Sequence, residues 1–182
     1  MTTRVGAVLG TVLVGMLALA QPAGANNIVV NGGFETGDLT GWILSGNTGF
    51  TGVNTVNPHS GVYAYESGAV GSESIISQTL PTIAGDFYNF SLWEADGGSF
   101  SVYWNGVAVI NQQAGFGPYT QVSGTVLAVG NDVFAIGLRN DPSWSHVDDV
   151  VVESTVPEPA TGVLLLTGLA AIARRRRLAK KS

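Results

Sequence analysis

The stretch from Ser101 to Val109, which reads SVYWNGVAV, decides the fold class of this chain. Its centre, Asn105-Gly106, is a pair that readily adopts the two positive φ angles of a type I′ turn. Valine, tyrosine and tryptophan on either side of this pair are residues that favour strands. We therefore expect the two flanks to pair as an antiparallel β-hairpin.

The rest of the central region also has the pattern of β-structure. Short alternating or apolar runs are separated by turn residues, and no helical period of useful length occurs. Phe134, Ile136 and Leu138 lie two residues apart, so they should share one buried face. The pattern predicts an all-β sandwich with further strands at 53–56, 63–65, 74–80, 88–94, 119–128, 133–139 and 146–153.

The first 25 residues are a predicted signal peptide and not a part of the fold. Arg4 supplies the positive charge, residues 5–20 are apolar, and Ala23 and Ala25 place small residues at the cleavage positions. The mature chain should then begin at Asn26. The alternative is an N-terminal helix that is not cleaved.

The C-terminal segment, residues 154–182, has the features of a signal that is handled at a membrane. A short linker leads to Val156, Pro157, Glu158 and Pro159, where the prolines fix φ and keep the chain extended. The apolar run 160–173 can form a helix of roughly 21 Å, which is shorter than the roughly 30 Å of a bilayer core. The basic stretch 174–181 should stay on the cytoplasmic side, and it opens with Arg174, Arg175, Arg176 and Arg177.

This order of parts resembles the PEP-CTERM sorting tail of Gram-negative bacteria. The resemblance implies that an intramembrane exosortase recognises and cleaves the tail. It also implies export, an inner-membrane intermediate held by the apolar helix, and delivery to the cell surface or the extracellular matrix. The alternative is an ordinary C-terminal membrane anchor.

The mature region between the two signals is strongly acidic. It contains one basic residue, Arg139, against twelve acidic residues, which gives a net formal charge of −11. Such a surface repels phosphate, so we expect no nucleic-acid partner. The chain has no cysteine, which excludes disulfides, thiolate nucleophiles and thiolate metal sites. About 130 residues are enough to form one core, so a single domain is expected at 26–153.

Two motifs stand at opposite ends of this domain. The first, from Asn31 to Trp42, reads NGGFETGDLTGW, and the second, from His146 to Val152, reads HVDDVVV. Together they are similar to the galactose-binding-domain-like jelly rolls, a group that includes many carbohydrate-binding modules. The resemblance spans residues 28–153 and implies a jelly-roll β-sandwich. The opening motif is also common among PEP-CTERM proteins whose function is unassigned.

The same resemblance implies a structural calcium ion, because the first and last strands of these jelly rolls lie close together and often share one. Glu35 and Asp148 would supply carboxylates, and backbone carbonyls would complete the six to eight oxygens that Ca²⁺ accepts. Asp149 is the alternative to Asp148, since adjacent strand residues face opposite ways. The competing interpretation is that these acids are solvated turn and strand-end residues. Trp42 is expected in the core.

Sugar binding requires an aromatic face beside polar side chains. The candidates are Trp93, Tyr103, Trp104 and Tyr119. Each can equally belong to the core, because a jelly roll buries alternate residues, and for Trp104 the core is favoured. The sequence therefore predicts a non-catalytic surface or matrix protein with at most weak affinity for polysaccharide, and a dedicated carbohydrate-binding module is the alternative.

A hydrolase is the least supported interpretation. Glu94 and Asp96 lie two apart and could act as acid and base at a glycosidic bond. His146 near Asp148, with Ser143 or Ser145, could mimic part of a catalytic triad. No Gly-x-Ser-x-Gly elbow, phosphate-binding loop or zinc signature occurs in the sequence. We therefore expect no catalysis and no cofactor other than calcium.

Overall fold

The computed structural model describes residues 26–114 and 116–155. The predicted signal peptide (1–25) and sorting residues (156–182) lie outside these described residues. Ten strands and no helix occur in the described part of the chain, which confirms the expected all-β class. Within that part, no helix has the length and apolar character needed to cross a bilayer.

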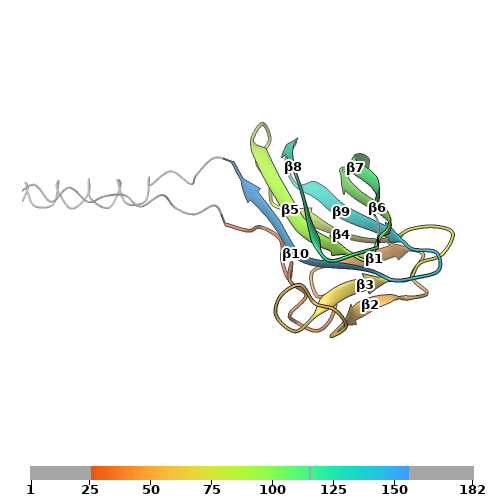
Figure 1. Ribbon diagram of the computed structural model, residues 1–182. Helices are drawn as coiled ribbons and strands as arrows, with labels where there is room; N and C mark the ends of the chain where they lie inside the picture. Colours follow the sequence, from red (N-terminus) through yellow and green to blue (C-terminus); the bar gives the residue numbers. More distant parts are fainter. Residues whose placement is uncertain (1–25, 115, 156–182) are drawn as a thin grey trace, which may run out of the picture. The chain divides into compact units, whose positions relative to one another are not determined.

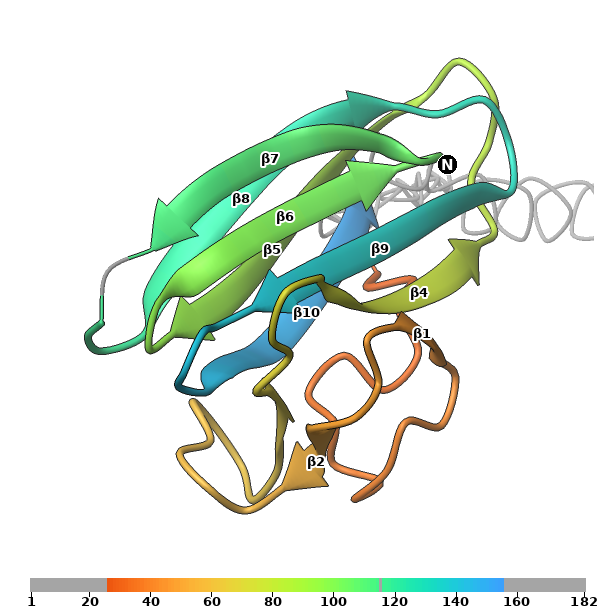
Figure 2. The same cartoon turned by 90° about the vertical axis from the view of Figure 1, so that its right-hand side faces the viewer.

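The strands form two five-stranded sheets in which every hydrogen-bonded neighbour is antiparallel. Figures 1 and 2 show the two layers, with β7, β6, β9 and β4 side by side in the first. The first sheet has the order β1 (Ile43–Gly46), β4 (Ser74–Leu80), β9 (Asp132–Arg139), β6 (Gly98–Trp104) and β7 (Val107–Ala114). The second has the order β2 (Thr51–Asn54), β3 (Ala64–Ser67), β10 (Ser145–Ser154), β5 (Phe87–Ala95) and β8 (Thr120–Leu127).

The core lies between the inner faces of these sheets. The predicted face of Phe134, Ile136 and Leu138 is confirmed, since all three side chains are fully buried. Phe90 of the second sheet packs against Phe134, with ring centroids 5.9 Å apart. A Cβ atom at Gly124 would lie 2.6 Å from the Phe90 ring, so the glycine makes room for this contact.

The hairpin predicted at residues 101–109 is confirmed. Asn105 and Gly106 have φ values of 52° and 78°, as the type I′ turn requires, and Trp104 pairs with Val107 across them. A bulge between Val102 and Tyr103 shifts the register of β6 against β7. Trp104 is buried in the core against Phe134.

The two ends of the domain meet, as the jelly-roll resemblance implies. The amide of Ile28 donates to the Val152 carbonyl at 2.9 Å, and the amide of Val150 donates to the Gly32 carbonyl at the same distance. Strand β1 was not predicted, because its residues show no alternation between buried and exposed positions. Strands β2 and β3 are each displaced by one or two residues from the predicted ranges 53–56 and 63–65.

Candidate functional site

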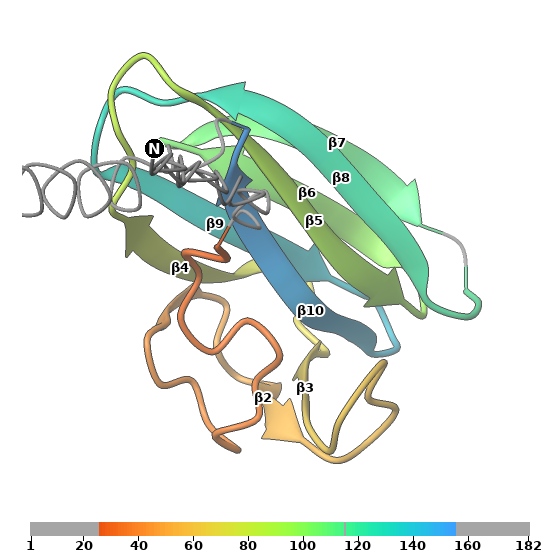
Figure 3. The same cartoon turned by 90° about the vertical axis from the view of Figure 1, so that its left-hand side faces the viewer.

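The outer face of the second sheet carries a groove of about 320 Å³. Strand β5 alternates so that Tyr88, Phe90 and Leu92 point into the core, whereas Asn89 and Ser91 do not. Figure 3 shows the three strands that form the groove, β8, β5 and β10, side by side. The residues that line it are Asn89, Phe90, Ser91, Ser123, Gly124, Thr125, Val151 and Glu153.

The chemistry of the groove is that of hydroxyl and amide groups. The side chains of Asn89 and Thr125 are hydrogen-bonded to each other, with Thr125 Oγ1 donating to Asn89 Oδ1 at 2.8 Å. Ser91 and Ser123 face each other across β5 and β8. Glu153 is the single acid in the lining. These residues were not named as a site from the sequence, although the polar half of the β5 alternation was a signal for them.

Trp93 lies on the same face of β5 as Ser91, two residues further along, and is half-buried. The imidazole of His59 stacks on its indole, with ring centroids 4.1 Å apart and planes inclined by 15°. The Tyr119 ring meets the His59 ring edge-on at 5.0 Å. Two of the predicted sugar-contacting aromatics, Trp93 and Tyr119, are therefore brought together around one histidine.

Tyr119 is fixed in this cluster by its hydroxyl group, which donates to the Asn57 carbonyl at 2.7 Å. The Asn57 amide in turn donates to Asp96 Oδ2 at 3.0 Å. Burial raises the pKa of Tyr119, and the nearby carboxylates of Asp148 and Asp96 raise this pKa further. The phenol therefore stays protonated and keeps its role as a hydrogen-bond donor at physiological pH.

The other two aromatic candidates lie elsewhere. The favoured placement of Trp104 in the core is confirmed, because inward alternation on β6 leaves the indole 6% exposed, and the alternative role of this residue as a ligand contact is contradicted. Tyr103 belongs to the first sheet, and its hydroxyl donates to Glu73 Oε2 at 2.7 Å. That hydrogen bond is the main cause of a raised Tyr103 pKa.

A further pair of exposed aromatics was missed by sequence reasoning. Phe50 and Trp144 meet edge-on, with ring centroids 6.4 Å apart, beside a hollow of about 200 Å³. The Trp144 ring lies against the backbone of Gly68, where a Cβ atom would stand 3.1 Å from it. Both aromatic residues follow turn-forming residues and do not belong to a run of alternating polar and apolar residues. The sequence pattern therefore gave no indication of their position.

Asp148 and Asp149, the two acids of the closing motif, both contact the loop between β2 and β3, residues 55–63. The expected opposite orientation of these two neighbours is not observed, because β10 has a bulge between Asp148 and Val151 and Asp149 has a φ of 49°. Asp148 Oδ2 accepts from the amides of His59 and Ser60 at 2.9 and 3.0 Å. Asp149 binds the Ser60 hydroxyl and His59 Nδ1, each at 2.7 Å.

Glu35, which belongs to the opening motif, is hydrogen-bonded to the same loop. Its Oε1 accepts from the amides of Val62 and Tyr63 at 2.9 and 3.0 Å. Gly33 adjoins all three acids, since a Cβ atom there would lie within 4 Å of Glu35, Asp148 and Asp149. The structure therefore brings together the three residues that were predicted to hold calcium.

Their present arrangement does not form a cation cage. Most of their oxygens accept from N–H or O–H donors of the loop, and Asp148 Oδ1 accepts from the amide of Asp149 at 2.7 Å. Among the residues that the structure describes, there is no group of three or more His, Asp or Glu side chains that could hold a metal ion. Burial raises the pKa of Asp148. Calcium stays a prediction of the resemblance.

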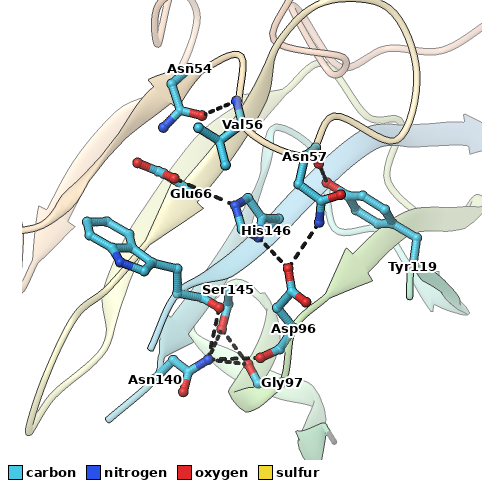
Figure 4. Close-up of polar contacts among 11 residues, drawn as sticks. Asn54, Val56, Asn57, Glu66, Asp96, Gly97, Tyr119, Asn140, Ser145 and His146 are labelled. Atoms are coloured by element: carbon cyan, nitrogen blue, oxygen red, sulfur yellow. Dashed lines mark hydrogen bonds and ion pairs between the residues drawn. The ribbon is translucent and has the colours of Figure 1, made fainter. Parts of the chain in front are cut away.

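A second polar cluster lies at the start of β10, where His146 sits between two carboxylates (Figure 4). His146 Nδ1 lies 2.9 Å from Asp96 Oδ2, and Nε2 lies 3.6 Å from Glu66 Oε2. The Ser145 hydroxyl donates to the Gly97 carbonyl. His146 thus contacts Asp96 and not Asp148, and the serine is engaged elsewhere, so the considered triad is not assembled.

Glu94 and Asp96 do not share an open face. Glu94 points into the core and is 2% exposed, and burial raises its pKa to about 7. Asp96 lies beyond the end of β5 in a turn, with a φ of 70°, and is partly exposed. The strand alternation that suggested an acid and base pair ends at Ala95.

One known sequence motif matches a part of this chain, and many solved structures are similar to its fold. Residues 155–177 match the PEP-CTERM protein-sorting motif. No curated protein matches the chain. Among solved structures, the carbohydrate-binding module TmCBM61, solved with β-1,4-galactotriose, is 19% identical with a TM-score of 0.57; the match covers 74% of this chain and all of that one.

Two further modules show the same fold. The CBM22-1 xylan-binding domain of Paenibacillus barcinonensis Xyn10C is 14% identical with a TM-score of 0.57, over 74% of this chain and 98% of that one. A family 16 carbohydrate-binding module is 15% identical with a TM-score of 0.54, over 69% and 99%. The chain therefore carries a PEP-CTERM sorting motif behind a jelly-roll β-sandwich of the kind seen in carbohydrate-binding modules.

Proposed function

We propose that this chain is an exported, non-catalytic protein of the cell surface or exopolysaccharide matrix, sorted through its C-terminal tail. The observation that carries the proposal is the sorting motif at residues 155–177, directly after the last strand. Its partner in processing is an exosortase, and its intermediate is held in the inner membrane by the apolar run 160–173. On arrival, the sandwich holds polysaccharide through weak contacts.

The groove on the second sheet is the proposed contact surface. Its hydroxyl and amide groups can exchange hydrogen bonds with sugar hydroxyls, and a pocket of this kind fixes orientation through a few polar groups. Trp93 stands beyond Ser91 on the same strand face and supplies an aromatic wall. The strongly acidic surface favours a neutral polysaccharide over a uronate-rich one, because like charges repel.

The arrangement of carboxylates supports a binding role over a catalytic one. Glycosidases place two carboxyl groups about 5–10 Å apart on either side of the scissile bond. The groove lining contains one, Glu153. Glu94 is enclosed by the core, and Asp96 is committed to His146 and Asn57.

The test of the binding role is retention of the protein on the producing organism's own exopolysaccharide, beside a hydrolysis assay on the same material. Trp93→Ala and Asn89→Ala should each reduce retention several-fold, with no sugar released by any form. Tyr103→Phe, on the other sheet, is the matched control and should be retained like the wild type. If the wild type is not retained, the binding role is contradicted and only the structural matrix role remains. Release of sugar fragments would overturn the non-catalytic proposal.

A further inference from the structure

One end of the sandwich is covered by exposed apolar side chains, and we call it the apolar end. Ile83 and Val129 are 65% and 70% exposed, and Phe87 and Leu127 are each 52% exposed. Val107 beside the β6–β7 turn adds a fifth exposed apolar side chain at this end. Monomeric proteins seldom expose a contiguous group of such side chains without a contact that covers it.

These side chains belong to one pre-formed surface, because the loops that bear them are hydrogen-bonded to each other. Phe87 and Leu127 are direct partners across β5 and β8. Beyond them, the Gly85 amide donates to the Ala128 carbonyl and the Ala128 amide donates to the Asp86 carbonyl, both at 2.9 Å. Figure 3 shows the β4–β5 and β8–β9 loops beside each other at this end.

The charges of the domain lie mainly away from the apolar end. Three acids lie in its loops and strand ends: Asp132 is buried against Thr82, and Asp86 and Glu153 are partly exposed. The cluster of Asp96, His146 and Glu66 lies at the start of β10, a ten-residue strand that finishes at the apolar end. At about 3.3 Å per residue, the strand separates the two ends by roughly 30 Å.

The chain leaves the described domain at the apolar end. Thr155 follows β10, and its amide and hydroxyl both donate to the Phe87 carbonyl, at 2.9 and 3.1 Å. The apolar run of the tail begins at Ala160, five residues later. Five extended residues span at most about 18 Å, so the start of the run cannot lie farther than this from Thr155.

We propose that the apolar end rests on the lipid interface of the periplasmic side of the inner membrane while the tail is attached. The inference depends on the proposed inner-membrane intermediate. When the run 160–173 lies in the bilayer, the short connection holds Phe87 and Leu127 next to the headgroup layer, which is roughly 5–8 Å deep. Burying their apolar surface there stabilises the contact, and the acidic opposite end points away from anionic lipid.

The test uses single cysteines, since the chain has none of its own. Leu127→Cys and Val129→Cys report on the apolar end, Val62→Cys is an equally exposed control near the acidic loop, and Leu165→Cys reports on the tail. Each exported chain, with its tail attached, carries an NBD label and is reconstituted into vesicles of phosphatidylethanolamine and phosphatidylglycerol. Melting curves like that of the wild type confirm that each labelled chain is folded.

The labels at positions 127 and 129 should be reduced by dithionite several-fold more slowly than the label at position 62, and doxyl lipids should quench them. Reduction as fast as at position 62, with a lipid-quenched tail label, would overturn the inference alone. A tail label that lipid does not quench would instead overturn the inner-membrane intermediate. Protection at position 127 without quenching by lipid would mean that the tail or a second copy covers the apolar end, which also contradicts the inference.

Discussion

The imidazole of His59 lies flat on the indole of Trp93, with ring centroids 4.1 Å apart and an angle of 15° between the planes. His59 is held there by Asp149, whose Oδ2 lies 2.7 Å from Nδ1. One face of the indole is therefore already occupied by a side chain of the protein. A sugar ring that stacks on this face has to displace His59, which accounts for the weak affinity that we expect of the groove.

Removing this cover should strengthen sugar binding. His59→Ala bares the indole face, so we expect retention on exopolysaccharide to rise several-fold, as aromatic faces in contact with a ligand are the main source of such affinity. His59→Phe keeps a ring in place and serves as the control, with retention close to that of the wild type. Equal or lower retention of His59→Ala would show that Trp93 does not use this face. The measurement is the bound fraction at a series of polysaccharide concentrations.

The buried carboxyl group of Glu94 should make stability depend on pH. Its folded-state pKa of about 7 exceeds the ordinary value of 4.5. Between these pH values the folded protein binds more protons than the unfolded chain, so the free energy of unfolding falls as the pH rises. Above pH 7 the cost is on the order of 3 kcal/mol, which Glu94→Gln should remove.

The check on Glu94 is denaturant unfolding at pH 5 and pH 8. The difference in unfolding free energy between Glu94→Gln and the wild type should be larger at pH 8 than at pH 5. Asp86→Asn, which removes a partly exposed carboxyl group in place of a buried one, is the control. A Glu94→Gln curve parallel to that of the wild type would contradict an ionisation cost at this position.

Calcium should raise the melting temperature if the jelly-roll resemblance extends to its metal. A cation that binds only the folded state adds about 2.7 kcal/mol at a hundredfold excess over its dissociation constant. Glu35→Ala should abolish the increase, whereas Asp38→Ala, in the same motif but bonded to Thr36 and Thr40, should keep it. Identical melting curves in chelator and in millimolar calcium would contradict a calcium site at these acids.

Much of the fold was readable in the sequence because its determinants are local. The positive φ angles of Asn105-Gly106 fixed the hairpin, and alternation in Phe134, Ile136 and Leu138 marked a core face. Alternation defines two faces without showing which face is buried, so the sequence could favour the core for Trp104 but could not establish it. The Asp149 bulge could not be foreseen, because it depends on how β10 pairs with β5.

The candidate site was less predictable than the fold. Its walls come from three strands that are distant in sequence, so Ser123 and Glu153 join Asn89 only through sheet pairing. The stacking of His59 on Trp93 joins a loop to a strand more than thirty residues later, and no sequence period links them. Glu35 and the two acids of the closing motif were found because both motifs resemble a known fold.

The sorting tail can be tested by changing its first residues. Pro157→Ala together with Glu158→Ala should prevent recognition by the exosortase, so the protein should accumulate in the inner membrane with its tail intact. Asn131→Ala, a loop change within the folded domain, is the control and should mature normally. Fractionation followed by immunoblotting measures the outcome. Normal maturation of the double variant would leave the tail as a plain membrane anchor.

The most direct test of the account is the intact mass of the protein recovered from the surface or matrix fraction of its own cells. Export and sorting predict a chain that begins at Asn26 and lacks the apolar run and Arg174 to Arg177. Any glycans should be removed before the mass is taken. A chain that retains the tail arginines, found in the inner membrane alone, would contradict the central claim.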